Sequence, residues 1–394
     1  MHRAVTSRRR SRAISSATTS ASGERAAVDE LLQQIPRGDA GFAVFFCTPH
    51  YDLGKLGHAL RAAGRVRAIA AATGRAIGSN GFLRQGITGF HLPAGRFKVA
   101  DAIIDRAAEF GLPEARDLAR SLRARLGRNI AATLPHLFGL LLVDAEARCE
   151  ERLIAALGTE LGGVPIVGGS AGDLYFDPRG PKPGTTRLLH RGVARRGAAV
   201  FCLIASATPL QAVSHTHYVP DRRRRVVITE ADPSRRLVLE INGRKALQAY
   251  TEAAGLKRTP RLAGECAPHP LMIRIGGQYF ARGVQRIYAD GSLEFACAME
   301  PGMVLTVARP GEMVAELNEM FNAMRRAIGP AELVVGFECA ARTAEMEQSG
   351  LTDAVSKVFR DNAVVGFSTL GEQFNTIHAN NSFTCVGLAT EDAV

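Results

Sequence analysis

The chain has 394 residues, of which 46% are hydrophobic and 22% are charged, as in ordinary globular proteins. Its length exceeds the usual size of one domain and predicts two domains, or one large α/β unit that carries an insertion. We expect no membrane span, because no uninterrupted apolar run reaches the roughly 18 residues that cross a bilayer. The composition therefore excludes a membrane-spanning protein and indicates a soluble, folded one.

The net charge of +11 is concentrated near the N-terminus. Residues 1–25 hold six arginines and one glutamate, so five of the eleven net charges lie there. The segment has no apolar signal-peptide core, and we expect a disordered basic tail, although its arginine and serine content also suits a transit peptide. Whether residues 1–25 belong to the mature protein stays open.

A second basic run places four arginines, residues 222–225, after Asp221 and directly before a predicted strand. No aromatic residues are interleaved with it, so we expect no nucleic-acid binding. The run suits the edge of a strand, where charge blocks pairing with other chains. A docking patch for an acidic partner is the alternative.

The seven cysteines are widely spaced and lie mostly in apolar runs. This pattern predicts reduced, buried thiols in a cytoplasmic protein rather than a disulfide framework. The chain has no CxxC pair, and the absence of CxxCH rules out the usual attachment of a c-type haem.

The predicted elements of the N-terminal half form two strand, helix, strand units, with further helices between them. In chain order they are a strand at 42–48, a helix at 52–64, a strand at 67–77, helices at 97–111 and 114–127, a strand at 138–144, a helix at 145–162 and a strand from 165 into the turn at 168–173.

The C-terminal half begins with predicted antiparallel strands and ends with a third strand, helix, strand unit. In chain order the elements are paired strands within 226–243, a helix at 245–256, a hairpin at 283–299 with an Asp-Gly turn, a strand at 302–312, a strand at 332–338, a helix around 349–361 and a strand from 363.

Paired strands in the three units start 25, 26 and 30 residues apart, which suits parallel strands joined by a crossover helix. The sequence thus predicts an α/β fold, mixed α+β in detail, of three repeat units with a β-rich antiparallel insertion. A Gly/Pro-rich stretch at 176–188 suggests the division. We expect a tail at 1–25, an α/β domain at 26–180, and a second α/β domain with the antiparallel segment at 181–394.

The stretch GGSAGD, residues 168–173, has the Gly-x-Ser-x-Gly spelling of a serine-hydrolase turn. An acid and a histidine follow in the permitted order, Asp221 and His378. However, the turn recurs near the C-terminus with Ser368, and a nucleophile is unique within its site. A repeated strand-end turn is therefore favoured, and a hydrolase or acyltransferase that uses Ser170 is the alternative from a different class.

Backbone donors of the repeated turns could bind an anion, yet Asp173 and Glu372 would repel phosphate and suit an amine. We therefore predict a polar ligand pocket between the turns and no catalytic residues. Its expected lining residues are Gly169, Ser170, Asp173, Ser368, Glu372 and Asn380.

The ten histidines show no metal spacing such as HExxH. His215 and His217 are two apart, which in a strand places both on one face. His378 stands among polar, turn-forming residues after the third turn. A solvated or capped histidine is the simpler interpretation of each, and the spacing is only weak evidence for a metal ligand.

Four landmarks in this order resemble the FIST sensory family, with its FIST-N and FIST-C segments. They are VPIVGGSAGDLYF, TEADPSRRLVLEINGRKALQAY, YADGSLEFACAMEPGMVLTV and VVGFSTLGEQFNTIHANNSFT. The resemblance runs from about Phe42 to Gly387. It implies a ligand-sensing input module for bacterial signal transduction, with small ligands such as amino acids.

FFCTPHYDL and GFLRQGITGFHLP are also similar to stand-alone FIST proteins that bind haem and respond to nitric oxide. This implies haem b as a cofactor and, in trans, a histidine kinase or cyclic-di-GMP signalling protein as partner. His378 is the first choice for the axial ligand and His217 the second. Four phenylalanines would line the haem slot: Phe45, Phe46, Phe367 and Phe374. An amino-acid or other metabolite sensor without haem is the alternative.

Three departures from the family spelling stand out. Leu370 replaces an aromatic residue in the third turn, Asn381-Ser382 replaces Gln-Thr after it, and Arg75 stands where an acidic residue is usual in the first. The loss of a tyrosine hydroxyl and of a carboxylate implies altered ligand chemistry or a member that no longer binds the family ligand.

Overall fold

The computed structural model describes residues 13–36, 41–64, 67–172 and 188–391. It is a mixed α/β structure in which three copies of one plan each build most of a six-stranded sheet. Each copy runs through an edge strand, a helix, a parallel strand pair joined by a helix, a hairpin and a return strand. The predicted fold class and its three strand, helix, strand units are confirmed.

The first repeat contains β1 (Ser15–Thr19), α2 (Glu24–Gln34), β2 (Phe42–Cys47), α3 (Leu53–Ala63), β3 (Arg67–Ala72), β4 (Arg75–Gly78), β5 (Gly81–Leu83) and β6 (Ile87–Leu92). The second contains β7 (Phe97–Ile104), α4 (Leu112–Leu126), α5 (Ile130–Thr133), β8 (His136–Asp144), α6 (Glu150–Leu161), β9 (Ile166–Ala171), β10 (Leu188–His190), β11 (Val193–Arg195) and β12 (Ala199–Ser206).

The third repeat contains β13 (Leu210–His215), α8 (Met313–Ile328), β22 (Ala331–Cys339), α9 (Ala340–Gln348), α10 (Thr352–Asp361), β23 (Val364–Thr369), β24 (Glu372–Phe374), β25 (Ile377–Ala379) and β26 (Phe383–Ala389). Between β13 and α8 it is interrupted by a β-rich insertion, residues 218–310, which we call the module.

The three repeats exchange their hairpins in a cycle. The parallel pairs are β2 with β3, β8 with β9, and β22 with β23. The hairpin strand β4 of the first repeat pairs with β23 of the third, β10 of the second pairs with β3 of the first, and β24 of the third pairs with β9 of the second. Each sheet is therefore completed by a neighbouring repeat.

The sheets share one core on their inner faces. Phe46 of the first repeat packs between Phe337 and Phe367 of the third, with ring centroids 6.3 and 5.0 Å away. The outer faces are covered by helices, α2 and α3 over the first sheet, α4 and α6 over the second, and α8 and α10 over the third. The unbroken apolar strands read from the sequence are buried on both sides for this reason.

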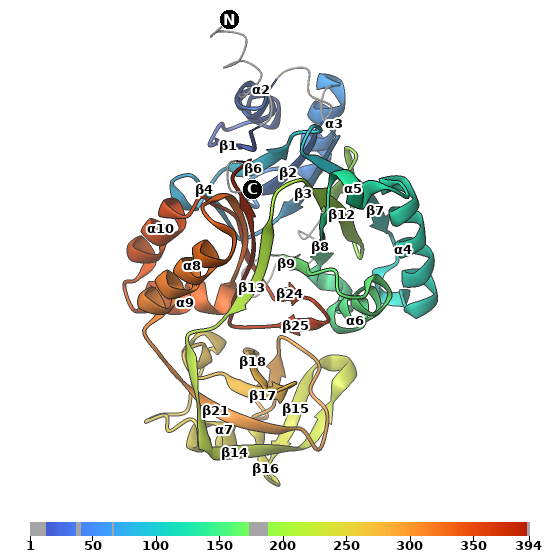
Figure 1. Cartoon of the computed structure of the whole chain (residues 1–394). Coiled ribbons are helices and arrows are strands. Elements are labelled where there is room, and N and C mark those ends of the chain that lie inside the picture. Colours follow the sequence, from blue (N-terminus) through green and yellow to red (C-terminus); the bar gives the residue numbers. More distant parts are fainter. Residues whose placement is uncertain (1–12, 37–40, 65–66, 173–187, 392–394) are drawn as a thin grey trace, which may run out of the picture.

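The module is antiparallel and holds its own core around α7. Its elements are β14 (Tyr218–Asp232), β15 (Leu237–Ile241), β16 (Arg244–Lys245), α7 (Ala246–Ala253), β17 (Leu271–Ile275), β18 (Gln278–Arg282), β19 (Val284–Ile287), β20 (Leu293–Phe295) and β21 (Val304–Pro310). Figure 1 shows it projecting from the three sheets on the side of β24 and β25. The chain enters and leaves it side by side, because Tyr218 pairs with Pro310.

Two expectations are corrected. Residues 97–104 form strand β7 rather than a helix, because they pair with β12 and their apolar side chains pack on both faces of the sheet, with Phe97 in the shared core and Ile104 against the helices. The tail expected to be disordered to residue 25 contains β1, paired with β6. The arginine run, by contrast, suits the strand edge expected for it, because β15 pairs with β14 only from Ile228 onward and residues 221–224 are out of register with β21.

The expectation for the cysteines is confirmed, whereas the expected domain boundary cannot be compared with the structure. All seven cysteines are free and buried, and burial raises the pKa of Cys47 to about 12. The proposed division at 176–188 lies almost wholly outside the described residues, as does Asp173. In the described part of the chain, no helix is long and apolar enough to cross a membrane.

Candidate functional site

In each repeat a turn follows the second strand of the parallel pair, which is β3, β9 or β23, and the three turns meet at one place. Thr73 Oγ1 donates to the carbonyl oxygen of Ser368 at 2.7 Å. Ser170 N–H donates to Thr369 Oγ1 at 3.0 Å, and Leu370 N–H donates to the Ser170 carbonyl at 3.1 Å. Crevices at the carboxyl ends of parallel strands are where α/β sheets bind ligands. This convergence defines the candidate site.

Ser170 and Ser368 occupy equivalent positions, opposite Val143 in the second sheet and opposite Glu338 in the third. Both side chains are buried. Ser170 Oγ donates to Glu150 Oε1 at 3.1 Å and accepts from Gln373 Nε2 at 3.1 Å. Among the described residues its hydroxyl thus meets an acid and an amide, without the histidine base that a serine nucleophile needs.

Glu150 links this cluster to the module. Arg236, in the turn between β14 and β15, donates to Glu150 Oε2 at 2.5 Å and to Glu151 Oε2 at 2.8 Å. Glu151 Oε1 also accepts from the backbone N–H of Ala298 at 2.8 Å. The module is therefore held against the second repeat by buried, charge-assisted hydrogen bonds.

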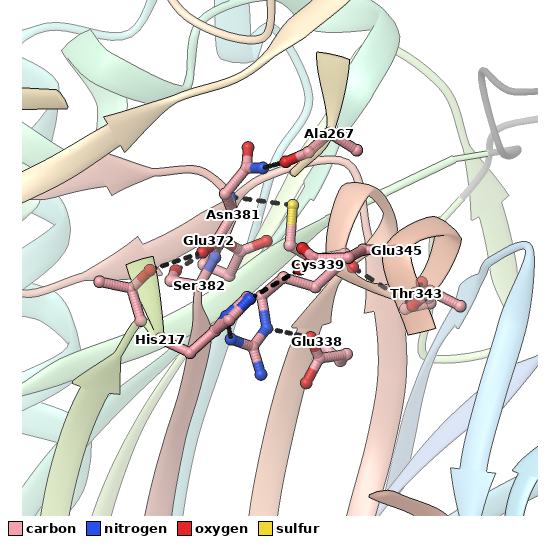
Figure 2. A network of polar contacts seen from close by, with 12 residues as sticks. His217, Ala267, Glu338, Cys339, Thr343, Glu345, Glu372, Asn381 and Ser382 are labelled. Atoms are coloured by element: carbon pink, nitrogen blue, oxygen red, sulfur yellow. Dashed lines mark hydrogen bonds and ion pairs between the residues drawn. The ribbon is translucent and has the colours of Figure 1, made fainter. Parts of the chain in front are cut away.

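A second buried cluster links the module to the third repeat (Figure 2). Arg342 donates from Nε to Glu338 Oε1 and from Nη1 to His217 Nδ1, both at 2.6 Å. His217 Nε2 lies 3.0 Å from Glu345 Oε1, and Tyr218 OH donates to the other oxygen of Glu345. Burial, then the Arg342 charge, lowers the pKa of His217. The imidazole is accordingly neutral, with its proton on Nε2.

Glu372 forms a third group with Ser382, whose hydroxyl donates to Glu372 Oε2 at 2.7 Å. Asn381, which precedes Ser382, donates from its backbone N–H to Cys339 Sγ at 3.1 Å and from Nδ2 to the Ala267 carbonyl of the module at 3.1 Å (Figure 2). Burial raises the pKa of Glu372 well above its usual range. Burial therefore favours the neutral carboxylic acid over the carboxylate at this position.

Unpartnered polar atoms gather around these groups. Among the described residues, the buried side-chain atoms of this region without a hydrogen-bond partner are Glu338 Oε2, Arg342 Nη2, Glu372 Oε1, Gln373 Oε1, His378 Nδ1, Asn380 Oδ1 and Asn381 Oδ1. Buried polar atoms are nearly always paired in folded proteins. Such a concentration indicates a place for a ligand or for water.

A small cavity of about 20 Å³ lies beside Asn380 and Asn381, between the third repeat and the module. Its walls on the repeat side are Cys339, Ala340, Ala341, Thr369, Leu370, Asn380 and Asn381. Its walls on the module side are Gly283, Val284, Gln285 and Ala296. This volume admits about one water molecule, so a larger ligand requires the module wall to move outward.

The predicted site residues are distributed over these groups. Gly169 and Glu372 are register partners in β9 and β24, and Asn380 lines the cavity. Ser170 lies in the Glu150 cluster, whereas Ser368 Oγ contacts Thr343 Oγ1 at 3.0 Å. His217 lies after the end of β13, so the expected pairing of His215 and His217 along one strand face does not occur.

Sequence reasoning missed Arg342, Glu345 and Asn381. Arg342 and Glu345 read as ordinary polar residues of an amphipathic helix, and the partner His217 is 125 positions from Arg342. Asn381 carried a signal, since it takes a left-handed φ of 49° that asparagine tolerates and stands in the HANNS stretch.

The first turn differs in charge from the third. Arg75 follows β3 where Glu372 follows β23, and its guanidinium contacts Glu347 on α9. At this position the chain thus has a cation that forms an ion pair with another repeat, where the usual acidic residue would place a carboxyl group in the pocket.

The described residues do not fit haem. Both ring nitrogens of His217 are bonded within the protein. His378 keeps Nδ1 without a partner, but its ring is buried against Gly371, with Nε2 3.2 Å from the Ala296 carbonyl, and leaves no room there for a porphyrin. Phe46 and Phe367 fill the shared core, whereas Phe45 faces the helices on the other side of its sheet. A porphyrin needs an apolar slot and a free axial donor.

E372Q is expected to make stability less dependent on pH. Burial raises the pKa of Glu372 in the folded chain, whereas in the unfolded chain this side chain has its usual pKa. At a pH between the two values, the folded chain holds a proton that the unfolded chain has released. The native chain therefore loses stability as the pH rises from the usual pKa toward the raised one. Glutamine still accepts from Ser382 and cannot ionise. Urea unfolding at about pH 6 and about pH 9 measures the slope, with the exposed E319Q as control. Equal slopes in E372Q and the native chain would contradict the assignment.

Comparisons with known proteins match most of the chain to two domains of one family. A model of the FIST N domain matches residues 41–244, and a model of the FIST C domain matches residues 246–375. No curated protein matches the chain. A solved structure described as that of "cyanuic acid hydrolase from A. caulinodans" aligns with 96% of this chain and 99% of that one, at 11% identity and a TM-score of 0.33.

Proposed function

The chain belongs to the FIST family of small-ligand sensors in signal transduction, and we propose that its ligand is a small polar metabolite held between the third repeat and the module. The ligand class is one with both hydrogen-bond donors and an anionic group, as in an amino acid. The observation that carries this proposal is the set of unpartnered polar atoms beside the cavity.

Most of these atoms are acceptors. Asn380 Oδ1, Asn381 Oδ1 and Gln373 Oε1 come from side chains that are at most 1% exposed. Leaving buried polar atoms unpaired costs about 1–3 kcal/mol each, which a donor group on the ligand would recover. An ammonium or amide group supplies several donors at one point. The acceptors thus favour an amine over phosphate.

The cavity wall at Cys339, Ala340 and Ala341 is the N-terminus of α9. No side chain caps this helix. Uncapped helix N-termini attract anions through their backbone N–H groups and the helix dipole. A carboxylate at this end and an amine near the two asparagines would satisfy both kinds of group.

Because the other wall belongs to the module, ligand binding is coupled to module position. The closed arrangement leaves about 20 Å³, so a metabolite shifts the chain toward an arrangement in which Gly283–Gln285 stands further from Asn381. We propose that this shift is read in trans by a histidine kinase or a cyclic-di-GMP signalling protein, as the resemblance implies. Haem-based nitric oxide sensing is the competing proposal, and the cavity of about 20 Å³ beside Asn380 and Asn381 is too small for its cofactor.

The test is a binding screen of the twenty protein amino acids by thermal shift, confirmed by calorimetry. N380L keeps the size of the side chain and removes its unpartnered oxygen, and we expect it to weaken the best ligand about tenfold or more. N318L on the exposed face of α8 is the control and should bind as the native chain does.

Three results would overturn the proposal. The first is that no amino acid binds, and the second is that N380L and N318L bind the best ligand equally well. The third is a Soret band on titration with haemin, with affinity above that of albumin and a shift on addition of nitric oxide.

A further inference from the structure

The positive charge of the chain is held in two places. The module, residues 218–310, contains fifteen lysines and arginines against nine aspartates and glutamates, a net charge of +6. Residues 1–25 carry +5, and the whole chain carries +11. All other residues together are therefore neutral. The module differs in charge from the three repeats that carry it.

Much of this charge stands in one run that leaves the sheet. The register of β14 against β21 jumps from Pro220 opposite Ala308 to Arg225 opposite Thr306. Four residues of β14, 221–224, thus face a single residue of β21. In a regular strand, alternate arginines would point into the module core beside Val226 and Leu305. Residues 221–224 leave the ladder and Arg225 rejoins it, and all four arginines are exposed.

The loop after α7 adds to the same area. The guanidinium of Arg224 lies 3.3 Å from where a Cβ on Gly255 would stand, and the exposed Lys257 and Arg258 follow one residue after Gly255. We call Arg222–Arg225 with Lys257 and Arg258 the basic face. It combines β14 with the loop after α7.

Few counter-charges accompany the basic face. Asp221 lies 3.6 Å from Arg224, and Glu265 lies 2.8 Å from Arg258. The other side chains of the face, Arg222, Arg223, Arg225 and Lys257, have no ion-pair partner among the described residues. Adjacent like charges repel and destabilise a fold. The module therefore carries a charge arrangement that its own stability does not require.

We propose that the basic face docks a partner protein with an acidic surface. Guanidinium groups pair with carboxylates through two parallel hydrogen bonds, and arginine is enriched in protein interfaces. Exposed aliphatic side chains adjoin the run, Val219 at 37% and Val304 at 52% exposure. In the described part of the chain the large exposed apolar side chains are all aliphatic, whereas single-stranded nucleic acid is bound by stacking on aromatic rings.

This surface is separate from the cavity, whose module wall is Gly283–Gln285 and Ala296. Docking is therefore testable without any ligand, and its failure leaves the ligand proposal untouched. In a sensor, the module would carry the ligand wall and the partner surface on one rigid body.

The experiment uses the full chain and a fluorescent peptide of alternating glutamate and leucine as probe. We expect saturable binding that weakens as sodium chloride rises from about 50 to about 500 mM. A quadruple variant, R222Q/R223Q/R224Q/R225Q, should weaken binding about tenfold or more. The control removes the same charge from exposed positions on the repeats, R84Q/R120Q/R128Q/R326Q, and should bind as the native chain does.

A charge-reversed variant, R222E/R223E/R224E/R225E, should lose the acidic peptide and gain a peptide of alternating lysine and leucine. Equal losses in the module and control variants would overturn the proposal, because binding would then follow total charge. Tighter binding of an oligonucleotide or of phosphatidylserine vesicles than of the acidic peptide would also overturn it. Circular dichroism of each variant shows that the fold is retained.

Discussion

G366A is expected to prevent the third sheet from forming. A Cβ on Gly366 would stand 1.7 Å from the carbonyl oxygen of Gly336 and 2.6 Å from its carbonyl carbon. Both atoms belong to the backbone of the parallel partner strand, which cannot move aside without breaking the β22 and β23 ladder. Overpacking of a core commonly costs about 1–3 kcal/mol, and we expect about 3 kcal/mol or more here.

Urea unfolding followed by circular dichroism measures this loss, and soluble yield gives a second reading if the variant does not fold. G95A is the control, because a Cβ at Gly95 meets nothing within 4 Å. A midpoint of G366A equal to that of G95A would show that the two strands do not approach as closely as described.

R342M is expected to lower the free energy of unfolding by about 3–5 kcal/mol. Methionine fills much of the same space but leaves Glu338 as a buried acid without its cation, and His217 without its donor. Removing one partner of a buried ion pair costs more than the pair contributes, because the remaining charge stays desolvated.

The loss in R342M should also depend on pH. Without the guanidinium, burial and the nearby Glu345 both raise the pKa of Glu338 with nothing from Arg342 to oppose them, so the variant loses more stability as the pH rises. R326M is the matched control, since its ion pair with Glu319 is 65% exposed on both sides and should matter by less than about 1 kcal/mol. A loss of similar size in both variants would contradict the buried network.

The repeat plan could be predicted from the sequence because its signals are local. Apolar runs at 42–47, 138–144 and 331–339 are long, and the crossover spacing leaves few topologies. Strand β7 was predicted as a helix because its apolar residues recur at helical spacing over a short window. Pairing with β12, about a hundred positions away, decides its conformation.

The site could be predicted only in part. The repeat of Ser170 as Ser368 identified the turns, since equivalent positions in a repeat carry similar residues. The charge network around Arg342 could not be found, because it joins α9 to the entry of the module across more than a hundred positions. Which polar atoms lack partners is likewise a property of packing and not of composition.

The cyclic exchange of hairpins makes the three repeats interlock like the segments of a ring. A fragment ending before the third repeat would lack β24, leaving the edge of β9 open, and would lack β23, leaving β4 without a sheet. Open apolar edges of this kind recruit other chains. The two matched domain segments meet at residues 244–246, inside the module. They are thus divisions of the sequence, whereas in the fold each sheet is completed by a hairpin strand from another repeat.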